Sequence, residues 1–214
     1  MPKSIVLCYS PGACSLAPHI VLNEIGEGFT LRKFATSERA NQSSEYLAIN
    51  AKGRIPSLII DGFTLTENPA ILAYLGRRFP EAKLYPATTG EAEARVLEWL
   101  AWVSNTVHIS IAQVFRPERY TDESNHHASI AAQGKELVRQ QFMQIEKHLA
   151  RNAFAVGSAL TVVDACLLPY YRWGNRMKLD MRADYPAFTR FVERLGERPA
   201  VKRALETEGI GLLG

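Results

Sequence analysis

The sequence predicts an α/β domain followed by an all-helical domain, and three observations lead to this prediction. Short apolar runs typical of strands alternate with helical patterns in about the first eighty residues. A stretch rich in Pro, Ala, Thr and Gly then has the composition of a linker. Beyond it, apolar residues recur at helical spacing and no comparable strand run appears. We therefore expect a first domain at residues 1–80, a linker at 81–90 and a helical domain at 91–214.

The first domain is expected to have the element order β-α-β-α-β-β-α. Its strands are predicted from short apolar runs bounded by turn residues, at 5–9, 29–34, 57–60 and 63–65. Asp61-Gly62 joins the last two strands, and this dipeptide favours a tight hairpin. Helical spacing and end signals predict helices at 15–25, 43–49 and 67–79.

The second domain is expected to consist of helices, at 91–115, 129–151, 162–177, 186–196 and 199–207. Thr161 and Asp164 have the spacing of a capping box before one of these helices. We interpret that pair as a folding signal with no catalytic role.

The composition is that of an ordinary globular protein: 47% of the residues are hydrophobic and the net charge is +3. Neither domain is strongly basic, so nucleic-acid binding has no support. The three cysteines stand at irregular spacing without a C-x-x-C pair, which favours free thiols over a metal site or disulfides. No apolar stretch approaches the roughly 20 residues of a membrane span. We therefore expect a cytoplasmic protein without metal or membrane.

Cys14 is the residue with the clearest chemical potential. It follows Pro11-Gly12 and comes just before a predicted helix. Free amides and the helix dipole stabilise an anion there, so we expect a lowered thiol pKa and thiolate character. Free cysteines are also commonly small buried apolar residues. Position alone leaves both readings open.

Three further segments have an ordinary structural explanation. Most X-Pro bonds are trans, so the residues alone favour a trans bond at Ile55-Pro56. Thr66 to Asn68 can bind the charged end of a ligand, but spacing favours simple helix capping by Thr66. His108, with Asn105 three residues earlier on the same helical face, is more often a structural histidine than a catalytic one.

Taken together, these residues resemble the glutathione transferase superfamily, and most closely its bacterial Beta class. The resemblance covers nearly the whole chain. It rests on Lys52-Gly-Arg-Ile-Pro56, Leu65-Thr-Glu-Asn-Pro-Ala-Ile71, Leu160-Thr-Val-Val-Asp164 and, for the class, Tyr9-Ser-Pro-Gly-Ala-Cys14-Ser-Leu-Ala-Pro-His-Ile20 and Glu98-Trp-Leu100 followed by His108.

The resemblance implies a thioredoxin-like first domain, a cis bond at Ile55-Pro56, a homodimer and glutathione as co-substrate. It assigns the contact with the glutathione sulfur to Cys14 and His108. It assigns the binding of the rest of glutathione to Arg39, Ile55, Pro56, Glu67, Asn68 and Asn105. The second substrate is then a small hydrophobic electrophile, which we expect near Val107, Ile111, Phe115 and Trp173.

Three functions remain open at this point. The first is conjugation of the glutathione thiolate to the electrophile. The second is thiol-disulfide exchange through Cys14, limited to monothiol chemistry because no resolving cysteine is near in sequence. The third is a non-catalytic protein that binds glutathione or apolar ligands, since Asn68 and Ala101 depart from the family pattern. Detoxification, a catabolic step and redox repair are all compatible with the sequence.

Overall fold

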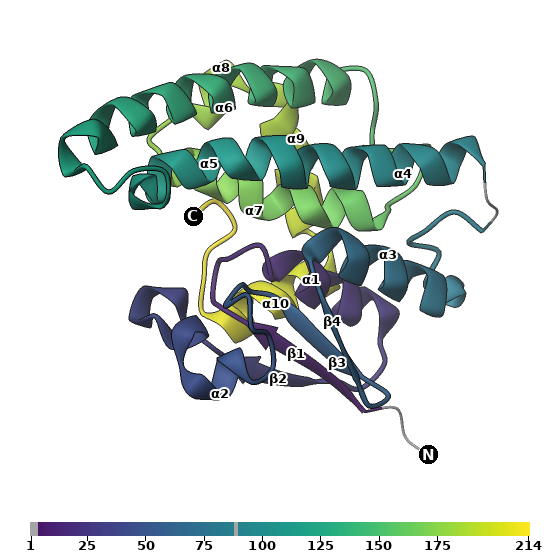
Figure 1. Cartoon of the computed structure of the whole chain (residues 1–214). Helices are drawn as coiled ribbons and strands as arrows, with labels where there is room; N and C mark the ends of the chain where they lie inside the picture. Colours follow the sequence, from purple (N-terminus) through teal and green to yellow (C-terminus); the bar gives the residue numbers. More distant parts are fainter. Residues whose placement is uncertain (1–3, 88–89) are drawn as a thin grey trace.

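The computed structural model describes residues 4–87 and 90–214. Its N-terminal domain is built on a four-stranded sheet in the order β2-β1-β3-β4. β1 runs parallel to β2 and antiparallel to β3, which pairs antiparallel with β4 (Figure 1). The strands are β1 (Ile5–Tyr9), β2 (Thr30–Lys33), β3 (Ser57–Ile60) and β4 (Phe63–Thr66). The predicted thioredoxin-like element order is confirmed.

Helices cover both faces of this sheet. They are α1 (Leu16–Ile25), α2 (Ser44–Leu47) and α3 (Asn68–Arg78). Side chains alternate along β1, so Leu7 joins the main core while Cys8 joins a small cluster with Phe34 and Tyr46 on the other face. The expected hairpin is present, and Asp61 and Gly62 have the positive φ angles of 48° and 89° that its tight turn requires.

The C-terminal domain is helical. Its helices are α4 (Glu91–Trp102), α5 (His108–Phe115), α6 (His127–Leu149), α7 (Val162–Arg176), α8 (Met181–Asp184), α9 (Pro186–Gly196) and α10 (Pro199–Glu208). The predicted capping box is confirmed, because Thr161 and Asp164 cap α7 reciprocally. The short α8 was not predicted, since four residues give too little periodicity to detect.

The predicted single helix at 91–115 is interrupted. A π-helical turn at Val103–Val107 separates α4 from α5, and the His108 amide donates to the Val103 carbonyl, five residues back. This wide turn shifts the helical phase, so spacing across it no longer predicts which side chains share a face. The segment immediately after the π turn begins with His108.

The two domains meet along α1. Both α7 and α10 pack against α1, so the last helix of the chain lies beside the N-terminal domain (Figure 1). The expected linker contributes to this contact: Leu84 and Tyr85 are buried, and the Val162 amide donates to the Leu84 carbonyl at 2.9 Å. Residues 88–89 of that linker lie outside the described residues.

None of the helices in the described ranges combines the length and the apolar composition that crossing a bilayer requires.

Candidate active site

The loop between β1 and α1 is closed by its own polar groups. The Ser10 amide donates to Ser15 Oγ at 3.2 Å, and Ser15 Oγ donates back to the Ser10 carbonyl at 3.1 Å. Ser10 Oγ also accepts from the Thr36 amide at 3.0 Å. Because these bonds span the loop, they fix the backbone that carries Cys14.

The C-terminal domain holds the same loop from the other side. The Gly12 amide donates to Glu208 Oε2 at 2.8 Å, and Trp173 Nε1 donates to the Gly12 carbonyl at 3.0 Å. Glu208 also lies 2.9 Å from Nδ1 of His19, and both side chains are buried. Gly12 has a φ of 67°, and a Cβ there would lie 3.0 Å from Arg172 Nη1, so this position requires glycine.

Cys14 is buried, with 6% of its surface exposed, and its thiol donates to the Ile55 carbonyl at 3.4 Å. Burial raises the pKa of Cys14 to about 12, and its hydrogen bonds from backbone amides offset this only in part. The predicted lowering of this pKa is therefore wrong for the free protein. Cys14 does lie just before a helix, as predicted. Desolvation of the thiolate nevertheless raises its pKa by more than the amide donors lower it.

The Ile55-Pro56 bond is cis, as the resemblance implied and against the general preference for trans. The residue before it is held firmly: the Arg54 carbonyl accepts from Tyr46 Oη at 2.6 Å and from Asn50 Nδ2 at 2.8 Å. Pro56 is buried and Ile55 is half-buried. This segment thus runs directly beside the Cys14 thiol.

Asn68, at the start of α3, contacts the backbone of Cys14. Its Nδ2 donates to the Cys14 carbonyl at 3.2 Å, while its Oδ1 is buried with no hydrogen-bond partner among the described residues. Glu67 is exposed and accepts from Lys52 Nζ at 2.5 Å. The predicted capping role of Thr66 is wrong, because Thr66 is the last residue of β4. The residue before α3 is Glu67, and its side chain makes no capping hydrogen bond.

His108 reaches the same region from the helical domain. Its ring lies 5.2 Å from the Trp173 ring and 6.0 Å from the Tyr170 ring, measured between centroids. Burial lowers its pKa to about 4, and the positive charges of Arg54 and Arg119 lower it further. The imidazole is therefore neutral near pH 7, a donor and acceptor without charge.

The other two predicted residues lie at the periphery. Asn105 is exposed on the π turn, and the change of helical phase separates it from the half-buried setting of His108. Arg39 is exposed after β2, where its backbone has a left-handed φ of 56°. Its segment is joined to the active-site loop through the Ser10–Thr36 contact, with 3.1 Å between the hydroxyl oxygens.

The expected apolar wall for an electrophile is largely absent. Val107, Ile111 and Trp173 are buried in the core, with at most 7% of their surface exposed. Only Phe115 keeps part of its surface open, and the Arg176 guanidinium lies over its ring at 5.3 Å. The helical spacing that suggested a cleft-lining face marks the face that packs into the domain core.

Sequence reasoning missed several residues that build the site. No local sequence motif marks the charged residues Glu208, Arg54 and Arg119. Glu208, for example, is nearly two hundred positions from its partner Gly12. Their roles depend on contacts between distant segments, which no short motif encodes. For Arg54, position inside the Lys52–Pro56 element is the one available signal.

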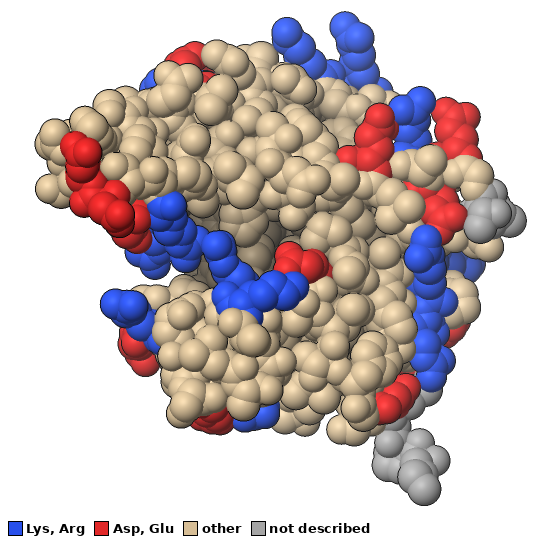
Figure 2. Space-filling model, in the orientation of Figure 1, with Lys and Arg blue, Asp and Glu red and all other residues tan. Residues whose placement is uncertain are grey.

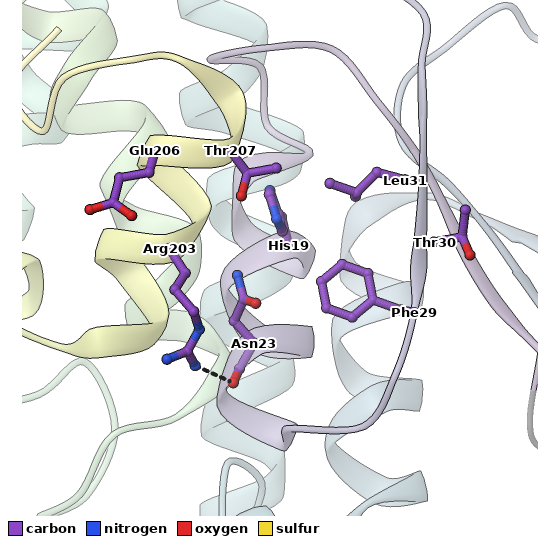
Figure 3. A pocket seen from close by; sticks show the side chains of 8 residues that line it. All are labelled: His19, Asn23, Phe29, Thr30, Leu31, Arg203, Glu206 and Thr207. Carbon is purple, nitrogen blue, oxygen red and sulfur yellow. Dashed lines mark hydrogen bonds between the residues drawn. The ribbon is translucent and has the colours of Figure 1, made fainter.

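A separate pocket of about 450 Å³ lies away from this site, between α1, β2 and α10 (Figure 3). Arg203 reaches across it, and its Nη2 donates to the Asn23 carbonyl at 3.1 Å. The pocket is shallow and open, and neither Cys14 nor His108 lines it. The candidate active site therefore lies between the domains, where Cys14, Asn68 and His108 are found.

Comparison with known proteins gives a consistent result. The model of the glutathione S-transferase N-terminal domain matches residues 6–77, and that of the C-terminal domain matches residues 106–199. The glutathione S-transferase GstA of Escherichia coli O157:H7 is 32% identical over 206 residues, covering 95% of this chain and 98% of that protein.

Solved structures agree. A sphingomonad glutathione S-transferase complexed with glutathione is 34% identical, with a TM-score of 0.86, and the match covers 96% of this chain and all of that one. A bacterial beta class glutathione S-transferase of Sphingomonas chungbukensis is 32% identical, with a TM-score of 0.86 and 96% and 100% coverage. With two family models, a full-length relative and matching folds, the chain belongs to the glutathione S-transferase family.

Proposed function

We propose that the protein is a glutathione transferase that joins the sulfur of glutathione to a small, largely apolar electrophile. Family membership supports the reaction class, and relatives whose structures contain glutathione support the co-substrate. In this reaction the thiolate of glutathione is the nucleophile, so the protein has to bind the peptide and stabilise its sulfur as an anion.

The buried Asn68 Oδ1 is the observation that carries the proposal. A buried acceptor without a donor costs about 1–3 kcal/mol, so the site is suited to a ligand that brings a donor. The α-ammonium group of the γ-glutamyl end of glutathione is such a donor. Glu67 lies next to Asn68, and its carboxylate, which is paired with Lys52 in the free protein, would also attract that group. Ile55 and Pro56 offer extended backbone against which the peptide would lie.

Cys14 and His108 would contact the glutathione sulfur as neutral hydrogen-bond donors. In the free protein the Cys14 thiol already donates to Ile55, and a bound thiolate is a stronger acceptor than that carbonyl. The neutral imidazole of His108 has one N–H to donate. Arg39 and Asn105, at the periphery, would contact the outer parts of the peptide.

The raised pKa of Cys14 favours conjugation over thiol-disulfide exchange. A thiol with a pKa of about 12 is almost entirely protonated near pH 7, whereas exchange needs a protein thiolate. Conjugation needs only the thiolate of glutathione. A non-catalytic binding role remains a distinct outcome, and binding without turnover would select it.

Binding can be tested by calorimetry with the full chain at millimolar glutathione. We expect Asn68→Ala to weaken binding about tenfold, the effect of losing one hydrogen bond to a charged group. Asn152→Ala, a change at an exposed asparagine just after the C-terminal end of α6, is the matched control and should bind as wild type. N-acetylated glutathione lacks the ammonium and should bind weakly to all three. Equal affinities for glutathione and its N-acetyl form would contradict the proposal.

We also propose that the protein is a cytoplasmic homodimer with the domain limits 1–80 and 91–214. Phe63 on β4 and Leu97 on α4 are large apolar side chains exposed by 43% and 42%, which a partner subunit would cover in the homodimer. The free cysteines support a reducing compartment. Sedimentation should give about twice the 23.9 kDa chain mass.

A further inference from the structure

Positive charge collects on both rims of the hollow between the two domains. Figure 2 shows Lys and Arg side chains on the sheet domain and on the helical domain that reach toward one another over this hollow. Arg54 of the first domain, and Arg116 and Arg119 of the second, lie close enough for their charges to act on one another, and Arg54 and Arg119 also act on His108. All three are exposed.

Hydrogen bonds fix the backbone of both rims next to the reactive groups. Arg54 is held through its carbonyl and directly precedes Ile55, which accepts from the Cys14 thiol. On the other rim, Tyr120 Oη donates to the Ile109 carbonyl at 3.2 Å. This bond folds the segment that carries Arg119 back along α5, beside His108. The arginines therefore flank the two residues assigned to the sulfur.

These arginines lack their usual counter-charges. Within residues 4–87 and 90–214, none of the three forms an ion pair with a carboxylate. Glu67, whose negative charge acts on the Cys14 thiol, is already paired with Lys52. Glu118 is the sequence neighbour of Arg119 and influences it without an ion pair. The hollow thus holds an excess of positive charge.

The titration of two groups reflects this excess. Partial desolvation lowers the pKa of Arg119, and the charges of Arg54 and Arg116 lower it further. Arg54 and Arg119 together also help to keep His108 neutral, after burial. Each guanidinium would gain from a bound anion, because a planar fork of donors matches a carboxylate or sulfonate in two parallel hydrogen bonds.

We propose that the electrophile carries an anionic group on its apolar body, a carboxylate or sulfonate, and that Arg54 and Arg119 bind this group across the hollow with Arg116 beside them. The inference rests on the proposed glutathione transferase function and narrows its substrate class. The anionic group of such a substrate is repelled by the negative charge of the glutathione thiolate. The positive charges of the arginines offset this repulsion. Tyr120, which is 41% exposed, and the open part of Phe115 offer apolar surface on the segment that carries Arg116 and Arg119.

A matched pair of aryl chlorides tests this: 4-chloro-3-nitrobenzoate, an anion, and the neutral 4-chloro-3-nitrobenzamide. In both, the glutathione sulfur forms a bond to the ring carbon and the carbon–chlorine bond breaks, which releases chloride. The reaction needs no oxidant and no reductant. For each compound, kcat/KM is divided by the rate constant of the reaction without protein. This removes the difference in intrinsic reactivity between the carboxylate and the amide.

We expect the normalised value for the anion to exceed that for the amide by about tenfold or more in the wild-type protein. Arg54→Gln and Arg119→Gln should each lower this ratio about tenfold, the effect of losing one charge-assisted hydrogen bond. Arg119→Lys should keep part of it, and 1 M salt should reduce it by screening. Arg139→Gln, at an exposed arginine of α6, is the matched control and should leave the ratio unchanged.

The glycine carboxylate of glutathione is the other anion that the arginines would suit, and a separate arm distinguishes it. If the arginines bind that carboxylate, the KM of the wild-type protein is higher for glutathione monoethyl ester than for glutathione. The arginine variants then lose activity equally toward the two electrophiles. That result overturns the inference, as does a wild-type ratio near one. Failure of the function itself has a different signature, because neither compound would then be turned over with glutathione.

In that last case the inference is decided by binding. The glutathione conjugates of the two compounds are titrated into the full chain by calorimetry. Tighter binding of the carboxylate conjugate, lost in Arg119→Gln and kept in Arg139→Gln, supports the anion site. Equal binding of the two conjugates contradicts it.

Discussion

The thiol of Cys14 donates to the carbonyl of Ile55 at a sulfur-to-oxygen distance of 3.4 Å. This contact joins the loop before α1 to the segment at the cis bond, and it gives the buried thiol a neutral partner. A thiolate in the same position would face that carbonyl oxygen and lose its hydration. The structure therefore holds Cys14 as a proton-bearing donor, and several consequences are measurable.

Cys14 should be alkylated slowly. With a pKa of about 12, the thiolate fraction at pH 7 is on the order of 10⁻⁵, against a few per cent for an ordinary cysteine. We expect iodoacetamide at pH 7 to label Cys14 at least a hundred times more slowly than glutathione in the same tube. Peptide mapping by mass spectrometry measures both rates. Labelling of Cys14 as fast as glutathione would mean that the helix-start position dominates over burial.

Replacing Cys14 should weaken conjugation without abolishing it. Cys14→Ala removes one donor to the glutathione sulfur, and we expect kcat/KM to fall about tenfold, with partial recovery in Cys14→Ser because a hydroxyl also donates. Initial rates with a neutral aryl chloride give these values. Complete and equal loss in both variants would indicate that the protein thiolate is the nucleophile, as the exchange reaction requires.

His108 should make the fold sensitive to mild acid. Its pKa is about 4 in the fold and about 6.5 when unfolded, so between these values the unfolded chain takes up the proton first. The contribution to stability is complete above pH 6.5 and is lost as the pH falls toward 4. The unfolding free energy of wild type should therefore drop between pH 7 and pH 4.5 by about 2 kcal/mol more than that of His108→Asn.

Urea unfolding at both pH values measures this difference. His126→Asn, at a largely exposed histidine, is the control and should follow the wild-type curve. If wild type and His108→Asn lose the same free energy, the imidazole is not held neutral by its surroundings.

Glu208 should be more important to stability than its place near the C-terminus suggests. Its buried carboxylate accepts from Gly12 and contacts His19, so Glu208→Ala leaves both without a partner. We expect a loss of about 3 kcal/mol of unfolding free energy, because two buried hydrogen-bonding groups lose their partner at about 1–3 kcal/mol each. Glu206→Ala on the exposed face of α10 should change it by less than about 0.5 kcal/mol. If Glu208→Ala and Glu206→Ala lose equally little unfolding free energy, Glu208 does not anchor the loop between β1 and α1.

Most of the fold was predictable from local patterns. The short apolar run of β1, the Asp61-Gly62 turn and the capping box at Thr161 each act over a few residues, and the structure contains all three. The π turn at Val103–Val107 was not predictable, because its residues have ordinary helical spacing. Tertiary packing, which decides whether a turn widens, leaves no trace in that spacing.

The site was predictable in position more than in chemistry. Cys14, Asn68 and His108 lie on segments that the motifs identified, and the residues that anchor them were found only in the structure. The sign of the pKa shift at Cys14 depended on burial, which a position before a helix does not reveal. The positive rims depend on Arg54 and Arg119 meeting from two domains, a relationship between segments far apart in the chain.

The most direct test of the account follows the sulfur. The full chain is incubated at pH 7 with glutathione and 1-chloro-2,4-dinitrobenzene, without an oxidant, and both the thioether product and the intact protein mass are measured. We predict that the thioether forms faster than in the protein-free reaction while Cys14 remains a free thiol. A rate equal to that of the protein-free reaction, with or without glutathione attached to Cys14, would contradict the account.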